Sequence, residues 1–230
     1  MDNNHSKIPN NDYQDISTYD PVSRYGIRKA NEMSFGKSII PDYDFSKAKS
    51  IVSVDADFMD NWLLHSQYVT QYAKTRNPQG EWMSKHFQFE TRLSLSGTNA
   101  DVRVPIMPSQ EGAVALAIYN QVAKLAGAAS MQGNADGLPE SAVAEAASSL
   151  YANRGKSLFI CGSNDPNVQV IANVINAVLE SYGSRISTDV ETFINQGNDE
   201  DIMQLVADIN AGKIAALLIH GGINPAYSLP

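Results

Sequence analysis

Short apolar runs that end abruptly in polar or glycine-containing loops are the main pattern along the chain. They occur at residues 51–57, 158–164 and 217–224. The first run contains Ile51, Val52 and Val54, and β-branched side chains of this kind are typical of a buried strand in a parallel sheet. Because the carboxyl ends of parallel strands meet at one edge of a sheet, we expect the three loops to gather at that edge.

Apolar and amphipathic segments predict helices around these strands. The predicted helices cover residues 23–35, 110–126, 139–153, 166–182 and 199–211. Further strands are predicted at residues 86–90 and 102–106, joined by a polar loop at residues 93–101. Strand and helix alternate through the second half of the chain. The sequence therefore predicts an α/β fold with a Rossmann-like, mainly parallel sheet and helices on both faces, as in a dinucleotide-binding domain.

The domain organisation follows from length and polarity. Residues 1–14 are polar and rich in asparagine, which predicts a flexible N-terminal segment. Residues 15–230 are expected to form a single α/β domain, because a chain of 230 residues can bury one sizeable core. Residue 230 follows a loop at the place where a further helix is expected, which indicates a fragment of a longer subunit.

The loop after the first strand carries charges that do not suit a nucleotide. A phosphate site at a strand end usually has glycines, whose N–H groups face the anion. This chain has Asp55 and Asp57 instead. Two carboxylates at a strand end are typical of a solvated loop, and the alternative interpretation is a cation site.

Composition excludes several classes of function. The net charge of −8 argues against nucleic acid and against an anionic membrane as partner, and no apolar run is long enough for direct membrane insertion. Cys161 is the one cysteine, so the chain alone can form no disulfide and hold no iron–sulfur cluster. Cys161 lies in the apolar run SLFICG, which predicts a buried and unreactive thiol.

Four motifs, in order, resemble the molybdopterin oxidoreductase family. HGGINPAYSLP at residues 220–230 resembles its strand-end glycine and Asn-Pro motif. TRLSLSGTNADVRVPIMPSQEGAVALA at residues 91–117 resembles its loop, strand and helix, where the usual form has Asp-Pro-Arg, then Ala-Asp, then Pro-Ile-x-Pro-Gly. Residues 18–36 and 35–64 are similar to one branch, the molybdopterin-like domain of the large iron–sulfur subunit of bacterial alternative complex III, a quinol-oxidising respiratory complex. The resemblance covers nearly the whole chain.

The resemblance implies a dinucleotide edge, either working or vestigial. In the catalytic family these loops hold a pterin–guanine dinucleotide, with glycines at the phosphates and a strand-end carboxylate at ribose or guanine. The positions carried over by motif are Asp55, Asp57, Glu90, Arg92, Asp101, Gly221, Gly222, Asn224 and Pro225. Asp55 stands where the family has glycine, and Glu90-Thr91 stands where it has Asp-Pro. A carboxylate facing a diphosphate costs several kcal/mol, on the order of 3, unless a cation lies between them.

The metal-ligand region of the family corresponds to residues 20–25, which contain no cysteine. Ser23 and Asp20 are permissible ligands if molybdenum is bound. The alternative interpretation is that Asp20-Pro21 forms a turn and Ser23 caps the following helix.

The resemblance implies a non-catalytic scaffold domain of an iron–sulfur subunit in a quinol-oxidising electron-transfer complex. No cofactor is then expected in this chain, and the clusters lie outside it. The partners are the rest of its own subunit and other subunits of the respiratory complex, on the periplasmic side of the bacterial inner membrane. Two alternatives stay open. One is part of a catalytic oxidoreductase that binds molybdopterin guanine dinucleotide, and the other is an α/β module for a different nucleotide or small molecule.

Overall fold

A computed structural model of the protein describes residues 16–133 and 137–221. These residues belong to two units. Residues 24–194 form one unit, and the other combines the two ends of the chain, of which residues 16–23 and 195–221 are described. No described helix has the length and apolar character needed to cross a membrane.

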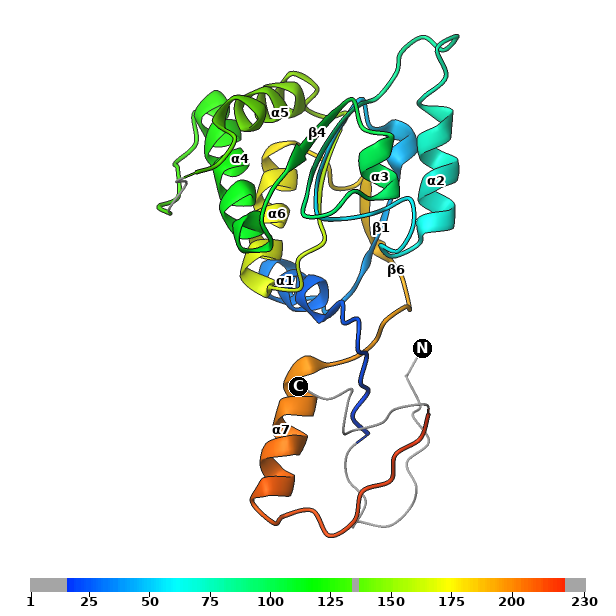
Figure 1. The fold of residues 1–230 in the computed structure, drawn as a ribbon, viewed down its shortest axis with the longest axis vertical. Coiled ribbons are helices and arrows are strands. Elements are labelled where there is room, and N and C mark those ends of the chain that lie inside the picture. The colour runs from blue at the N-terminus through cyan, green and yellow to red at the C-terminus, as the bar shows by residue number, and fades with distance from the viewer. Residues whose placement is uncertain (1–15, 134–136, 222–230) are drawn as a thin grey trace. The chain divides into compact units, whose positions relative to one another are not determined.

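The unit of residues 24–194 is built on a sheet of four parallel strands in the order β4-β3-β2-β5 (Figure 1). These strands are β2 (Ser50–Val54), β3 (Lys85–Glu90), β4 (Val102–Pro105) and β5 (Ser157–Cys161). Val54 of β2 lies opposite Phe89 of β3 and Cys161 of β5, so the carboxyl ends of three strands are level. This arrangement confirms the predicted Rossmann-like α/β fold.

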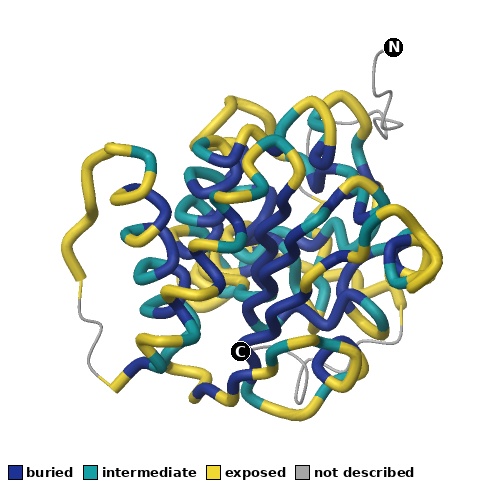
Figure 2. The backbone as a smooth tube through the Cα atoms, turned by 90° about the horizontal axis from the view of Figure 1, so that it is seen from above, coloured by how far each residue is buried: buried dark blue, intermediate teal, exposed yellow. Residues whose placement is uncertain are grey.

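Helices cover both faces of this sheet. They are α1 (Tyr25–Phe35), α2 (His65–Lys74), α3 (Leu95–Thr98), α4 (Glu111–Ala126), α5 (Glu140–Ala152) and α6 (Pro166–Val178), with 3-10 turns η1 (Phe45–Lys47) and η2 (Pro108–Gln110). Val52 and Phe159 face a core shared with α4, α5 and α6, whereas Ile51 and Leu158 face a second core shared with α2 and η1. Neighbouring residues of a strand point to opposite faces, so β2 and β5, which are buried along their whole length, each supply both cores (Figure 2).

A small antiparallel sheet accompanies the main one. It pairs β1 (Pro41–Tyr43) with β6 (Ile186–Glu191), a segment that the sequence pattern left unassigned. The unit of the chain ends contains α7 (Asp199–Asn210), which begins at Asn198 and has three acidic residues in its first turn. These acidic groups lie at the positive end of the helix dipole, which stabilises the helix.

The strand predicted in the apolar run IAALLI, before the loop at residues 221–224, is wrong. Residues 213–221 contain no strand, and Leu218 is 95% exposed. The main sheet ends instead at β5, whose outer edge is capped by side chains. Asn176 accepts from Phe159 N at 3.1 Å and donates to Phe159 O at 2.8 Å, and Gln169 Nε2 donates to Cys161 O at 2.9 Å. An apolar run forms a strand only where a neighbouring edge has free backbone groups, and these amides occupy that edge.

The polar loop predicted at residues 93–101 contains a helical turn that the pattern did not indicate. Ser94 is the N-cap of α3, and its hydroxyl accepts from Gly97 N at 2.9 Å. This turn lies directly after β3 and shapes the carboxyl edge of the sheet.

Candidate functional site

The carboxyl edge of the sheet begins with Asp55, the residue that follows β2. Its backbone has φ of 49°, a left-handed conformation that aspartate tolerates better than most residues. A Cβ at Gly162 would lie 2.1 Å from Asp55 O, so glycine is needed for the ends of β2 and β5 to approach this closely. Asp55 Oδ1 accepts from Thr91 N at 3.1 Å and from Thr91 Oγ1 at 3.3 Å.

Asp57 binds the next part of the loop after β3. Its Oδ1 accepts from Ser96 N at 3.0 Å and from Ser96 Oγ at 2.7 Å. Asp57 is 7% exposed, so these bonds compensate for much of the hydration that the carboxylate loses.

Glu90, the last residue of β3, is buried to 1% exposure and is paired with Arg103 of β4. Its carboxylate also accepts from Ser94 N at 3.3 Å and from Ser94 Oγ. A Cβ at Gly97 would lie 2.0 Å from Glu90 Oε1, so only glycine leaves room for this carboxylate beneath α3.

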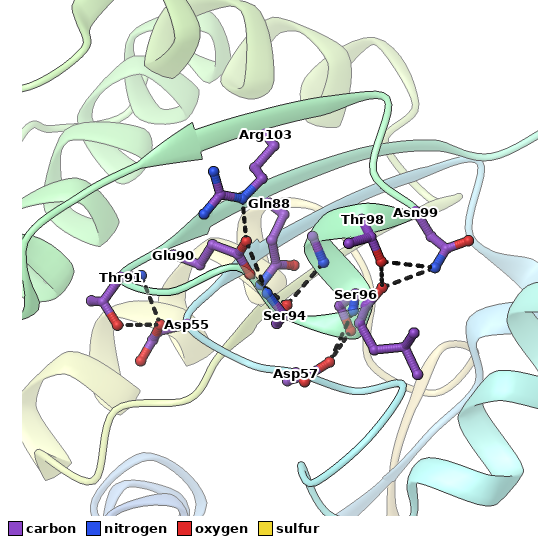
Figure 3. A network of polar contacts seen from close by, with 12 residues as sticks. Asp55, Asp57, Gln88, Glu90, Thr91, Ser94, Ser96, Thr98, Asn99 and Arg103 are labelled. Atoms are coloured by element: carbon purple, nitrogen blue, oxygen red, sulfur yellow. Dashed lines mark hydrogen bonds and ion pairs between the residues drawn. The ribbon is translucent and has the colours of Figure 1, made fainter.

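Three backbone N–H groups of the loop after β3 therefore bind carboxylates of the protein itself. They belong to Thr91, Ser94 and Ser96 (Figure 3). In a phosphate-binding loop, N–H groups of this kind face the anionic ligand. The described residues of this edge consequently do not offer a cradle for the diphosphate of a pterin dinucleotide, and the group does not fit here.

The space that remains at this edge is a small pocket of about 30 Å³. Its walls come from the ends of β2 and β3 and the loops that follow them: Asp55, Asp57, Asn61, Gln88, Glu90, Arg92 and Ser94. A single water needs roughly 10–15 Å³ by this kind of measure, whereas ligand pockets span about 300–1,000 Å³. The pocket has room for an ion or one or two waters and is far too small for a nucleotide.

A buried polar chain leads from this pocket into the interior. Tyr72 OH donates to Asn99 O at 3.1 Å and lies 3.2 Å from His86 Nδ1. His86 Nε2 lies 3.1 Å from the side-chain amide of Gln88, which has a nitrogen without a hydrogen-bond partner. Burial lowers the pKa of His86 to about 4, so the ring is neutral at physiological pH.

A fourth carboxyl group lies against Asp55 from the first turn of α4. Burial, followed by the charge of Asp55 and a carboxyl–carboxyl hydrogen bond with it, raises the pKa of Glu111 to about 7. The hydroxyl of Ser163 binds Glu111 and acts in the opposite direction. Glu111 thus keeps its proton up to about pH 7, and in that form it can donate a hydrogen bond to Asp55.

The structure brings together Asp55, Asp57, Glu90 and Arg92, but not every residue predicted for the site. Asp101 lies at the opposite, amino edge of the sheet, where it accepts from His86 N at 2.7 Å and from both terminal nitrogens of Arg76 at 2.7 and 3.0 Å. It therefore serves to close that edge. Gly221, with φ of 109°, belongs to the unit of the chain ends. Gly222, Asn224 and Pro225 lie outside the described residues.

The predicted metal ligands are not part of this pocket. Asp20 and Ser23 belong to the unit of the chain ends, where Asp20 packs so closely on Gly197 that a Cβ there would meet it at 2.7 Å. Within residues 16–133 and 137–221, no three His, Cys, Asp or Glu side chains are placed to hold a metal ion. Cys161 is buried, which confirms the predicted burial, and burial raises its pKa to about 12.

Sequence analysis missed several residues of this site. These are Gln88, Ser94, Ser96, Arg103 and Glu111. Ser94 had a usable signal, because a serine directly before a short turn is a favoured N-cap. The sequence carried no signal for Gln88, because neither the burial nor the neighbours of a glutamine in the middle of a strand can be read from the sequence.

Comparison with known proteins does not assign the chain to a family. No protein-family model matches the chain. No curated protein matches it either. Among solved structures, the chain is similar to acetylene hydratase from Pelobacter acetylenicus, with a TM-score of 0.45 and 11% sequence identity over 71% of this chain and 25% of that chain. This chain thus spans about a quarter of the length of that chain, and no statement about function follows from the likeness.

Proposed function

We propose that this chain is a non-catalytic, molybdopterin-oxidoreductase-like scaffold domain of an iron–sulfur subunit in a quinol-oxidising electron-transfer complex. The order of the four sequence motifs supports the family. One structural observation supports the loss of chemistry: the loop N–H groups at the carboxyl edge bind Asp55, Asp57 and Glu90.

Charge at this edge acts against a dinucleotide. A diphosphate would have to displace the carboxylates from the N–H groups and would then lie beside them. Arg103 is already paired with Glu90, and Arg92 is the one arginine among the pocket residues. Two negative groups about 4 Å apart repel by about 4 kcal/mol at an effective dielectric constant of 20, so the arrangement favours the closed network.

The proposed partners follow from the proposed role. With Cys161 as its one cysteine, this chain leaves the iron–sulfur clusters to other parts of its subunit. The domain would hold that cluster-bearing region, and other subunits of the complex, in place on the periplasmic side of the bacterial inner membrane.

The test is metal and pterin analysis of the native protein that contains this chain. Molybdenum, tungsten and iron are measured by mass spectrometry, and pterin is measured by fluorescence after oxidation. We expect iron without stoichiometric molybdenum, tungsten or pterin. Near-stoichiometric molybdenum or tungsten together with pterin would contradict the proposal and favour the catalytic alternative.

A further inference from the structure

The two outer strands of the main sheet, β5 and β4, differ in how their free edges are covered. At β5, side chains of α6 and of Ser181 bind outward-facing backbone groups of Ser157, Phe159 and Cys161. These three strand residues are at most 2% exposed. Side chains thus close this edge to a further strand.

The edge formed by β4 is open (Figure 1). Asp101 N donates to His86 O at 2.9 Å, so the backbone groups of Asp101 and of the alternate residue Arg103 face β3. The N–H and C=O groups of Val102 and Val104 therefore point away from β3. Within residues 16–133 and 137–221, nothing donates to or accepts from these groups. Val104 is 8% exposed although its side chain belongs to the core, which fits an edge that water can reach.

The segments that adjoin β4 expose apolar side chains. Leu93 and Leu95 lie just after the neighbouring strand β3, and Met107 lies two residues after the end of β4. All three are exposed. A strand added at this edge would pair its backbone with the free groups of β4 and would cover apolar surface with its own side chains.

The same chain contains an apolar run that has no strand partner. Residues 214–219, IAALLI, carry no charge and no proline, which is typical of a segment that adds to an open sheet edge. Residues 213–221 contain no strand. The large apolar residues of the run are all exposed: Ile214, Leu217, Leu218 and Ile219. In a single copy of the chain, the run is therefore unpaired and in contact with water.

We propose that β4 is a docking edge for residues 214–219 of a second copy of this chain. The run lies beside β4 as a further strand of the sheet and bonds to the outward groups of Val102 and Val104. Its alternate side chains pack on the two faces of the sheet. Because each copy carries both the edge and the run, two copies exchange their runs reciprocally and close as a two-fold dimer.

Sedimentation velocity of the full 230-residue chain at increasing concentration tests the docking. We expect a monomer that converts to a dimer. Leu218→Lys places a charge in the run, at a residue that is almost fully exposed in one copy, and should weaken dimerisation at least about 10-fold. Met203→Lys is the matched control, because it adds the same charge at an exposed apolar residue of α7 in the same unit. It should dimerise as the wild type does.

Hydrogen exchange shows where the run docks. The amides of Val102 and Val104 should exchange rapidly in the monomer and slowly in the dimer. The amide of Phe159, which donates to Asn176 Oδ1 at 3.1 Å on the closed edge, should exchange slowly in both. In Leu218→Lys, the amides of Val102 and Val104 should stay rapid at concentrations where the wild type is dimeric.

Three results would overturn the proposal. They are a monomer at every concentration, a dimer that Leu218→Lys weakens no more than Met203→Lys does, and exchange at Val102 and Val104 that is the same in monomer and dimer. Slow exchange in both forms would show that the edge is covered within one copy. Neither measurement depends on pterin content, so this proposal and the proposed function fail separately.

Discussion

At the amino edge of the sheet, the Asp101 carboxylate accepts hydrogen bonds from both terminal nitrogens of Arg76 and from the His86 backbone N–H. Arg76 therefore balances its charge. At the carboxyl edge, Asp55, Asp57 and Glu90 lie together, and of these only Glu90 has an ion pair. The same strands therefore end in a neutral closure on one side and in an acidic pocket on the other. A buried carboxylate therefore contributes little to stability by itself. The hydrogen-bond donors around it decide whether the edge of the sheet is closed or available to a ligand.

The largest effect is expected from Gly97→Ala, which should break the carboxyl edge. The added Cβ would lie 2.0 Å from Glu90 Oε1 and would push the buried carboxylate away from its partners. We expect a loss of about 3 kcal/mol in the free energy of unfolding, measured by urea denaturation. Gly80→Ala is the control, because its Cβ would meet Asn77 O at 3.2 Å in an exposed turn. Equal losses in the two variants would contradict the packing argument.

Arginine removal at each edge compares the two edges directly. Arg103→Met leaves the charge of Glu90, which is 1% exposed, without a cation. We expect a loss of about 2 kcal/mol, reduced from the value for a fully buried pair because Arg103 is 31% exposed. Arg76→Met removes the more exposed ion pair with Asp101 and should lower the free energy of unfolding by less than about 1 kcal/mol. Urea denaturation of both variants measures the difference, and the reverse order would contradict the comparison.

The stability contributed by the carboxyl edge should also fall as the pH rises from 5 to 8. The folded pKa of Glu111, about 7, lies above its unfolded value, so its stabilising effect is present below about pH 4.5 and is lost as pH rises to about 7. Glu111→Gln has no such loss. Between pH 5 and pH 8 we expect the variant to gain about 1 kcal/mol relative to the wild type, after allowing for solvent screening of this half-exposed group.

Glu140→Gln is the control for this titration, since Glu140 lies in the first turn of α5 as Glu111 lies in the first turn of α4, but is exposed. Denaturation at several pH values measures both variants against the wild type. A flat difference between wild type and Glu111→Gln from pH 5 to pH 8 would contradict the raised pKa of Glu111.

The smallest effect is expected at the amino edge, on the acid side. Burial alone would raise the pKa of Asp101, but hydrogen bonds from Arg76 and the His86 backbone hold it below its ordinary value. Its contribution is therefore present above about pH 4 and is lost as pH falls through the folded pKa. Asp101→Asn should be less stable than the wild type at pH 6, by less than about 1 kcal/mol, and this gap should narrow at pH 3. A gap that widens in acid would contradict the assignment.

The strands of the main sheet could be predicted from the sequence because they are short apolar runs with clear ends. β5, at Ser157–Cys161, for example, lies where the run at residues 158–164 predicted a strand followed by a loop. The pattern failed at residues 214–219, which are as apolar as any strand of the sheet. Apolarity measures the tendency to be buried, but a strand also needs a partner edge, and the capping of β5 by Asn176 and Gln169 cannot be read from local sequence.

The site was predictable only in part, for a similar reason. Asp55 and Asp57 follow β2 and Glu90 is the last residue of β3, so topology alone places them at one edge. Asp101 precedes its strand, and the same topological rule places it at the opposite edge. The serines that bind the carboxylates could not be foreseen, because their role depends on the path of a loop that contains α3.

The most direct test of the central claim is to detect the hydrogen bonds between the loop and the carboxylates in solution. NMR couplings across hydrogen bonds can be measured from the backbone nitrogens of Thr91 and Ser96 to the carboxyl carbons of Asp55 and Asp57. We expect both couplings in the 230-residue chain, together with slow exchange of these two amide protons. Absent couplings, with rapid exchange and saturable shifts of the same amides on addition of guanosine diphosphate, would show that the edge is open to a phosphate ligand and would contradict the account.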